Sequence, residues 1–268
     1  CLMAYTDNIM VFNGDSFTYG DELKGYKDNQ QDPHTFAYKL AQNHFNKKYV
    51  NLATNGSSNS KIFRTTLDFI HNTNKDIGLL CIMWTNWGRF ELCENFALPS
   101  DQEILIPQEC NMNQIIPSQR SGGFQWDNKA EDGGLERAEI LKAYTENVLT
   151  MHTQIMQGLT YMEHIQWLCD YMGIKLLMGV VHGDMYLNYL HTLKGDGYED
   201  YKVAVSTKMR RLRHENRIGL GHYHALWNIS KDKYTLRPNG HADEDAHTDF
   251  AEMLFSITEE KNFINAIN

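Results

Sequence analysis

The stretch that decides the fold is Ile9-Met10-Val11-Phe12-Asn13-Gly14-Asp15-Ser16-Phe17-Thr18-Tyr19-Gly20, near the start of the chain. Its first four residues form an apolar run that is typical of a buried strand, and Asn13-Gly14 ends that run. The strand therefore delivers Gly14-Asp15-Ser16 to its carboxyl end, where open α/β sheets bind their ligands. Taken alone, the triplet is better interpreted as a turn that caps the next helix.

Strands and helices alternate beyond this point. Short apolar runs predict further strands at 49–52, 77–83 and 175–181. Apolar residues at helical spacing predict helices at 35–45, 60–70, 136–172 and 246–257. The long third helix is expected to break near Gly158 and to end at Gly173 as its C-cap. Because such alternation is typical of βαβ units, we expect an α/β fold with a doubly wound, mostly parallel sheet flanked by helices.

Residues 92–135 interrupt the alternation. They hold Pro99, Pro107 and Pro117 together with two glycine pairs. We interpret them as an inserted, mostly irregular lobe within one domain that spans residues 1–268, since long insertions of this kind are usually functional or mobile. Residues 183–237 show no clear pattern.

The charge balance bears on the partners of the protein. The formal net charge is -9 and the pI is about 5.7. An acidic protein repels phosphate backbones, which argues against nucleic acid as a partner. The most basic stretch runs from Lys208 to Arg213. Its apolar Met209 and Leu212 are three residues apart, so we expect the solvated face of a helix rather than a binding patch.

The cysteines and apolar runs bear on the cellular compartment. The five cysteines include no Cys-x-x-Cys pair, which disfavours a disulfide framework or a zinc ribbon and favours a reducing compartment. Cys81 lies in an apolar run and is expected in the core. The sequence contains no run of about 18 apolar residues, so we expect no membrane span. The N-terminus lacks the layout of a signal peptide. We expect a cytoplasmic or virion-associated protein.

Three more segments follow strands or precede a helix. Asn55-Gly56 follows the second strand, where a glycine N–H can approach a ligand closely. Trp84-Thr85-Asn86-Trp87-Gly88-Arg89 follows the third, and its tryptophans are either core residues or the rim of a pocket. His241 precedes the last helix, where a lone histidine is more often structural than catalytic. Each segment alone also fits an ordinary loop or helix cap.

In this order the four segments resemble the SGNH or GDSL hydrolase family, whose blocks carry Ser, Gly, Asn and His. Gly14-Asp15-Ser16 resembles the first block closely, and Gly56 matches the second in placement. Thr85-Asn86 resembles the Gly-x-Asn-Asp block, with tryptophans in place of its outer residues. The stretch from His241 to His247 resembles the closing block.

The resemblance implies ester hydrolysis with Ser16 as nucleophile and His241 as general base. The N–H groups of Ser16 and Gly56 and the amide of Asn86 would hold the oxyanion. No cofactor is required. No histidine matches a metal-ligand spacing such as His-Glu-x-x-His, so no metal site is expected.

The chain departs from the family pattern at Pro238, where the family usually has the aspartate that orients the histidine. Asn239 cannot act as an anionic partner. Asp184, Asp243 or a backbone carbonyl are the remaining candidates for orienting His241. A shifted frame would make His247 the base, with Glu244 or Asp243 behind it.

The expected substrate is a small-molecule or glycan ester, contacted by Asp15, Trp84, Trp87 and Arg89. The run Trp84-Thr85-x-x-x-Arg89 is also similar to SGNH-like proteins of bacteriophages, which suggests virion or homo-oligomer assembly. The alternative is a module of this fold that binds glycans or builds a virion, with catalysis lost at Pro238.

Overall fold

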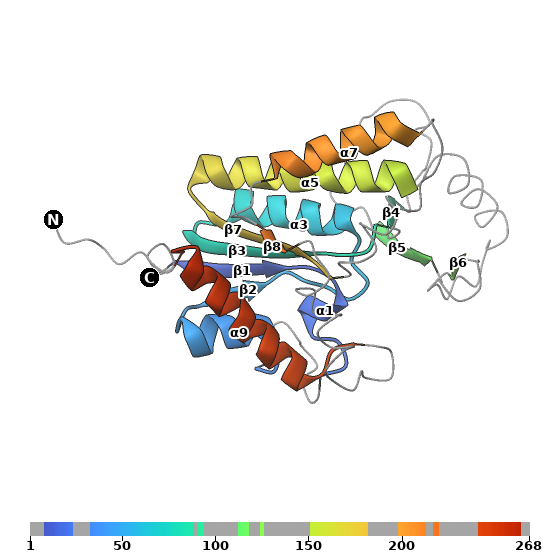
Figure 1. Ribbon diagram of the computed structural model, residues 1–268. Coiled ribbons are helices and arrows are strands. Elements are labelled where there is room, and N and C mark those ends of the chain that lie inside the picture. The colour runs from blue at the N-terminus through green and yellow to red at the C-terminus, as the bar shows by residue number, and fades with distance from the viewer. Residues whose placement is uncertain are drawn as a thin grey trace, which may run out of the picture.

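The computed structural model describes residues 8–23, 33–87, 152–181, 198–212 and 241–263, and the backbone of residues 90–93, 112–117, 124–125, 151 and 217–219. Its central sheet consists of β1 (Ile9–Asn13), β2 (Tyr49–Asn51), β3 (Ile77–Trp84), β7 (Lys175–Val180) and β8 (Arg217–Gly219). The strands are parallel and lie in the order β2-β1-β3-β7-β8 (Figure 1). The expected α/β fold with a parallel sheet is therefore confirmed.

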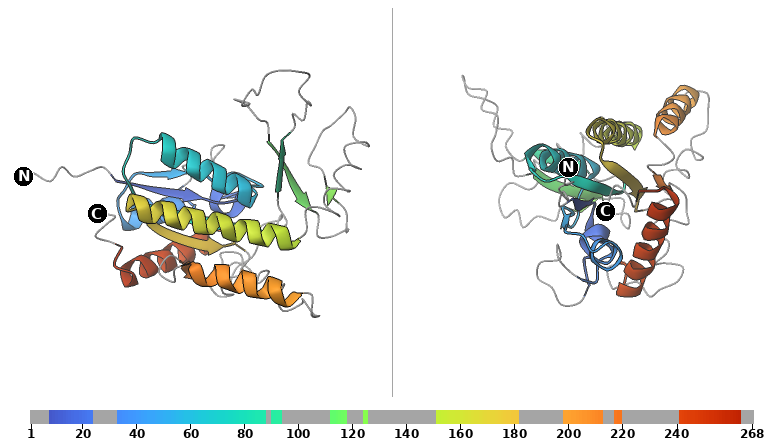
Figure 2. Two further views of the ribbon diagram at one scale, coloured as in Figure 1. Left: turned by 90° about the horizontal axis from the view of Figure 1, so that it is seen from above. Right: turned by 90° about the vertical axis from the view of Figure 1, so that its left-hand side faces the viewer.

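Helices cover both faces of this sheet (Figure 2). One face carries α3 (Asn59–Asn72), α5 (Met151–Met172) and α7 (Glu199–Arg211). The other carries α2 (Phe36–Tyr38), the π-helix η2 (Lys39–His44) and α9 (Glu244–Glu260). Successive strand residues point to opposite faces, so Met10 and Phe12 pack toward α9 while Ile9 and Val11 pack toward α3 and α5. Burial of both faces explains why the strands are continuous apolar runs.

The strand order creates a switch point at β1. The chain leaves β1 for β2 through α2 and η2 on one face, then crosses back through α3 on the other face to β3. Doubly wound folds bind their ligands at the carboxyl ends of the strands beside such a switch point. Gly14-Asp15-Ser16 follows β1 directly and therefore lies beside the switch point.

The sequence predicted special roles for two glycines, Gly158 within α5 and Gly173 directly after it. The predicted break near Gly158 is wrong, because α5 continues through this residue. A Cβ at Gly158 would lie 1.8 Å from Cζ3 of Trp87, so the glycine permits the indole to pack against the helix. The predicted C-cap is confirmed at Gly173, which has φ 72° and is followed by a bond from Ile174 N to the carbonyl of Cys169 of 2.9 Å.

Two segments contain strands that sequence patterns did not reveal. At the start of the expected lobe and within it, β4 (Phe90–Cys93), β5 (Met112–Pro117) and β6 (Phe124–Gln125) form an antiparallel sheet. The short β8 lies in the segment for which no pattern was found.

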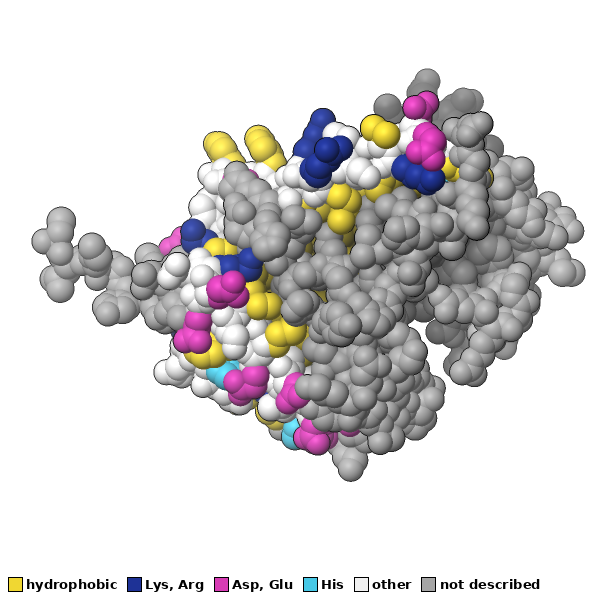
Figure 3. All heavy atoms as spheres, in the orientation of Figure 1, with side chains coloured by type: hydrophobic (Ala, Val, Ile, Leu, Met, Phe, Trp, Pro, Cys, Tyr) yellow, Lys and Arg dark blue, Asp and Glu magenta, His cyan; other side chains and the backbone are white. Residues whose placement is uncertain are grey.

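The basic run forms the end of α7, as expected. Leu212 is buried and Met209 packs against the core, whereas Lys208 and Arg211 face Glu163 of α5 at 2.6 and 3.9 Å. Figure 3 shows both basic and acidic side chains over α7, and several acidic ones over the side of the molecule formed by α9. In the part of the chain that the structure describes, no helix is long and apolar enough to cross a membrane.

Candidate functional site

The nucleophile candidate begins a short helix at the end of β1. Ser16 is the first residue of α1 (Ser16–Tyr19), and it is 2% exposed. Asp15 caps this helix by accepting a hydrogen bond from Phe17 N at 3.1 Å. The N–H of Ser16 has no acceptor within α1, because the first N–H groups of a helix have none. Gly20, at φ 86°, ends the helix and donates to the Ser16 carbonyl at 3.0 Å.

Asn13 fixes the direction in which the chain leaves β1. Its Nδ2 donates to the Ile62 carbonyl at 3.0 Å and to Thr66 Oγ1 at 2.8 Å, both on α3. Its Oδ1 accepts from Gly14 N at 2.8 Å. A Cβ on Gly14 would lie 2.2 Å from Thr18 Oγ1, so only glycine fits between β1 and α1. These contacts hold residues 14–20, which we call the serine turn, against the sheet.

Buried hydrogen bonds join the end of β1, the start of α3 and the end of β3. Thr85, directly after β3, donates its hydroxyl to Asp15 Oδ2 at 2.6 Å. Its backbone N–H donates to Asn59 Oδ1 at 2.9 Å, and Asn59 returns a bond to the Thr85 carbonyl at 3.2 Å. The serine turn, the start of α3 and the loop after β3 therefore form one connected unit.

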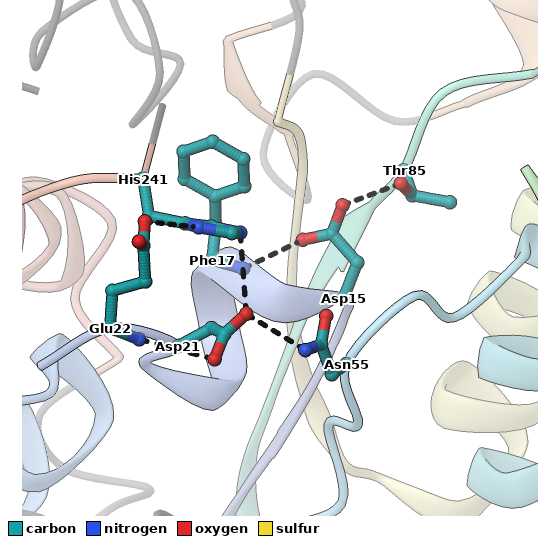
Figure 4. A network of polar contacts seen from close by, with 7 residues as sticks. All are labelled: Asp15, Phe17, Asp21, Glu22, Asn55, Thr85 and His241. Carbon is teal, nitrogen blue, oxygen red and sulfur yellow. Dashed lines mark hydrogen bonds and ion pairs between the residues drawn. The ribbon is translucent and has the colours of Figure 1, made fainter. Parts of the chain in front are cut away.

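The loop after β2 reaches the same place. Gly56 has φ 71°, a conformation that favours glycine. Its neighbour Asn55 donates to Asp21 Oδ2 at 2.8 Å (Figure 4). Asn51 donates to the carbonyl of Thr18 at 3.0 Å. The structure therefore brings the Gly56 loop to the residues that follow Ser16.

His241 lies over the serine turn, far from it in sequence. Its ring packs on Phe17 with centroids 5.0 Å apart. Nδ1 is 2.9 Å from Glu22 Oε2, and Nε2 is 3.8 Å from Asp21 Oδ2 (Figure 4). Among the described residues, no hydrogen bond joins His241 to the Ser16 hydroxyl. The imidazole thus sits beside the serine turn and faces two carboxylates.

The other candidates near the C-terminus have different partners. Asp243 Oδ1 accepts from Ala246 N at 2.9 Å and caps α9. Glu244 lies 3.6 Å from His34. Among the described residues, no hydrogen bond or ion pair joins Asp243 or Glu244 to His241.

His247 is buried against α2 rather than facing the serine turn. Its Nδ1 accepts from Phe36 N at 3.1 Å, and its ring stacks on that of Phe36. Burial, with smaller contributions from Lys39 and His241, lowers the pKa of His247 to about 3. A ring nitrogen that is already an acceptor in the core is poorly suited to take a proton from Ser16.

The residues expected to contact the substrate differ in burial and in their partners. Asp15 is fully buried and engaged by Phe17 and Thr85. Trp84 and Trp87 are 0% and 3% exposed and belong to the core, which is one of the two placements that the sequence allowed. Asn86 is half-buried and lies two residues after the end of β3. Arg89, Asp184 and Pro238 lie outside the described residues.

Sequence reasoning missed the residues that contact His241. Asp21 and Glu22 follow Gly20 directly, within six residues of Ser16. The candidates for the acid that the sequence offered, Asp184 and Asp243, both lie far from Ser16 in the sequence. The available signal was a pair of acidic residues immediately after the glycine that ends the serine turn. No group of three or more His, Cys, Asp or Glu residues in the described regions could hold a metal ion.

The chain matches no protein-family model and none of the curated proteins. Similar solved structures include a crystal structure of TesA, at 11% identity and a TM-score of 0.46, over 95% of this chain and 99% of that one. Another is LAE5, an alpha/beta hydrolase enzyme from the metagenome of Lake Arreo, Spain, at 10% identity and a TM-score of 0.44, over 95% and 96% of the two chains.

Proposed function

We propose that the protein is a serine-dependent ester hydrolase with Ser16 as nucleophile and His241 as general base. One observation carries this proposal. His241 packs on Phe17, the residue next to Ser16, and its Nδ1 is bound to a carboxylate at 2.9 Å. This is the arrangement that a general base needs, with one ring nitrogen oriented by an acid and the other available for a proton.

The ring nitrogen Nε2 is the proton acceptor in this proposal. It lies 3.8 Å from Asp21, beyond hydrogen-bond distance, and no other described residue bonds to it. Catalytic hydrogen bonds are often long without substrate and tighten when it binds. The missing contact between Ser16 and His241 is therefore compatible with catalysis.

The reaction would proceed through an acyl-enzyme. Ser16 Oγ attacks the ester carbonyl carbon while His241 Nε2 takes the hydroxyl proton. The N–H groups of Ser16 and Gly56 and the amide of Asn86 would stabilise the oxyanion of the tetrahedral intermediate. As the C–O bond breaks, His241 returns the proton to the leaving alcohol. Water then attacks the acyl-enzyme and releases the acid and Ser16.

The substrate we propose is a carboxylic ester of a small molecule or of a glycan. A competing function is a glycan-binding or virion structural module that retains the fold without the chemistry. The observation in its favour is that Ser16 and His241 do not bond to one another among the described residues. The two functions differ in whether Ser16 is reactive.

The test compares the purified protein with Ser16→Ala on p-nitrophenyl acetate and on an acetylated sugar. Ser256→Ala is a matched control, because this exposed serine on α9 bonds only to the Glu252 carbonyl at 3.1 Å. We expect hydrolysis by the wild type and by Ser256→Ala and none by Ser16→Ala. A fluorophosphonate probe should label Ser16 in the two active proteins. Equal background rates and no labelling would favour the non-enzymatic module.

A further inference from the structure

We propose that Glu22 is the positioning acid of His241 and replaces the aspartate that the family pattern places at Pro238. This inference rests on the proposed function and adds the residue that was missing from it. Glu22 comes from the nucleophile's own turn and not from the segment that carries the histidine. The two residues are 219 positions apart in the sequence.

The geometry of the pair is that of an oriented imidazole. Glu22 Oε2 and His241 Nδ1 are 2.9 Å apart, and the two side chains are 15% and 14% exposed. An ionised carboxylate can only accept a hydrogen bond, so the proton of the neutral imidazole must be on Nδ1. Nε2 then carries the lone pair that takes the Ser16 proton. The negative charge of Glu22 also stabilises the imidazolium that forms during attack.

The backbone holds Glu22 in an unusual conformation for this contact. Its φ is 65°, in the left-handed region that residues other than glycine rarely adopt. The surrounding turn is fixed, since Leu23 N donates to the Gly20 carbonyl at 3.2 Å and the Leu23 side chain is buried. Such conformations cost on the order of 1–3 kcal/mol and cluster at functional sites. The strain at Glu22 is therefore explained if the side chain must face His241.

Asp21 is the other carboxylate near the imidazole, and its contacts assign it a different role. It accepts bonds from Asn55 Nδ2 at 2.8 Å and from Glu22 N at 3.1 Å. Its distance to Nε2 is 3.8 Å, too long for a hydrogen bond. Asp21 thus ties the Gly56 loop to the serine turn, whereas Glu22 is the one described residue that bonds to the ring.

The first test reads the imidazole directly and needs no activity. In protein labelled with ¹⁵N-histidine, at a pH where the imidazole is neutral, we expect His241 to carry its proton on Nδ1. In Glu22→Ala the population should shift toward the Nε2–H form. Glu252→Ala is the matched control, because it removes a carboxylate that lies 3.4 Å from a different histidine, His44. His241→Asn assigns the signal. An unchanged tautomer in Glu22→Ala would overturn the proposal.

The second test separates this inference from the proposed function. We expect Glu22→Gln, which keeps the shape and removes the charge, to lower kcat by roughly 100- to 10,000-fold with KM changed only a few-fold. Glu22→Asp should recover part of that loss, and Glu252→Gln should match the wild type. If the wild type hydrolyses esters and Glu22→Gln does so equally well, Glu22 is not the positioning acid and the serine mechanism stands. If the wild type is inactive but the tautomer shifts as expected, the pair is supported and ester hydrolysis is overturned.

Discussion

Thr85 and Asp15 join the carboxyl ends of β3 and β1 through a buried hydrogen bond of 2.6 Å. Both side chains are fully buried. The same carboxylate accepts from Phe17 N at 3.1 Å, so it holds the start of the helix that begins with Ser16. The position of Ser16 therefore depends on the loop after β3, across the switch point of the sheet.

The first prediction concerns this bond. Thr85→Val keeps the shape of the side chain and removes the donor, so Asp15 loses this buried hydrogen bond. We expect a loss of about 1.5–3 kcal/mol in the free energy of unfolding, the usual contribution of a hydrogen bond to a carboxylate. Urea denaturation measures it. Thr160→Val on α5 is the control, because that hydroxyl bonds only to the Met156 carbonyl of its own helix at 2.8 Å. Equal stabilities of the two variants would contradict the argument.

The sequence predicted the central sheet because its strands are buried on both faces. Runs such as the one at Ile9 have no polar alternation, and helices with apolar stripes separate them. The serine turn was also predictable, since it directly follows β1. These features are local, and a few neighbouring residues determine them.

Other features depend on contacts between distant segments. Glu22 meets His241 only after the chain has returned across the sheet, and nothing near Pro238 points to it. From the sequence, Trp84 and Trp87 fitted either the core or a pocket rim, and the remote Gly158 of α5 leaves room for Trp87 in the core. β8 has three residues, too few for a periodic pattern. Local sequence reasoning fails where a partner comes from a remote segment.

The second prediction is a pH dependence of stability. His247 has a pKa lowered from 6.5 to about 3 in the folded protein, chiefly by burial. Between these values the unfolded chain binds more protons than the folded one, so stability falls as the pH drops from 6.5 toward 3. Each unit corresponds to about 1.4 kcal/mol. Urea denaturation over this range should show the decline.

His247→Asn is the variant that isolates this contribution. The oxygen of the asparagine side chain can still accept a hydrogen bond from Phe36 N, but the amide does not titrate. We expect a weaker pH dependence below 6.5 than in the wild type. The variant should also retain ester hydrolysis, whereas His241→Asn should lose it. The opposite result would make His247 the base.

The third prediction concerns the packing of α5. Gly158→Ala places a methyl group 1.8 Å from Cζ3 of Trp87, so the indole must move. We expect a loss of roughly 1–3 kcal/mol from overpacking, although alanine is the better helix former. Thermal denaturation measures it. In a Trp87→Leu background the same substitution should cost less, because the crowding ring is absent. Additive effects would show that the contact does not limit stability.

The last prediction concerns the reactivity of Cys81 and Cys169. Burial raises the pKa of each thiol to about 12, and Asp170 contributes at Cys169. Because the thiolate is the nucleophile, both residues should resist iodoacetamide at pH 8 in the folded protein and react once it is denatured. Peptide mapping by mass spectrometry distinguishes the two sites.

Cys169 lies near the end of α5, whereas Cys81 is in the middle of β3. Since helix ends open more readily than central strands, slow alkylation in the native state should reach Cys169 first. Rapid native alkylation of Cys81 would contradict the placement of β3 at the centre of the sheet.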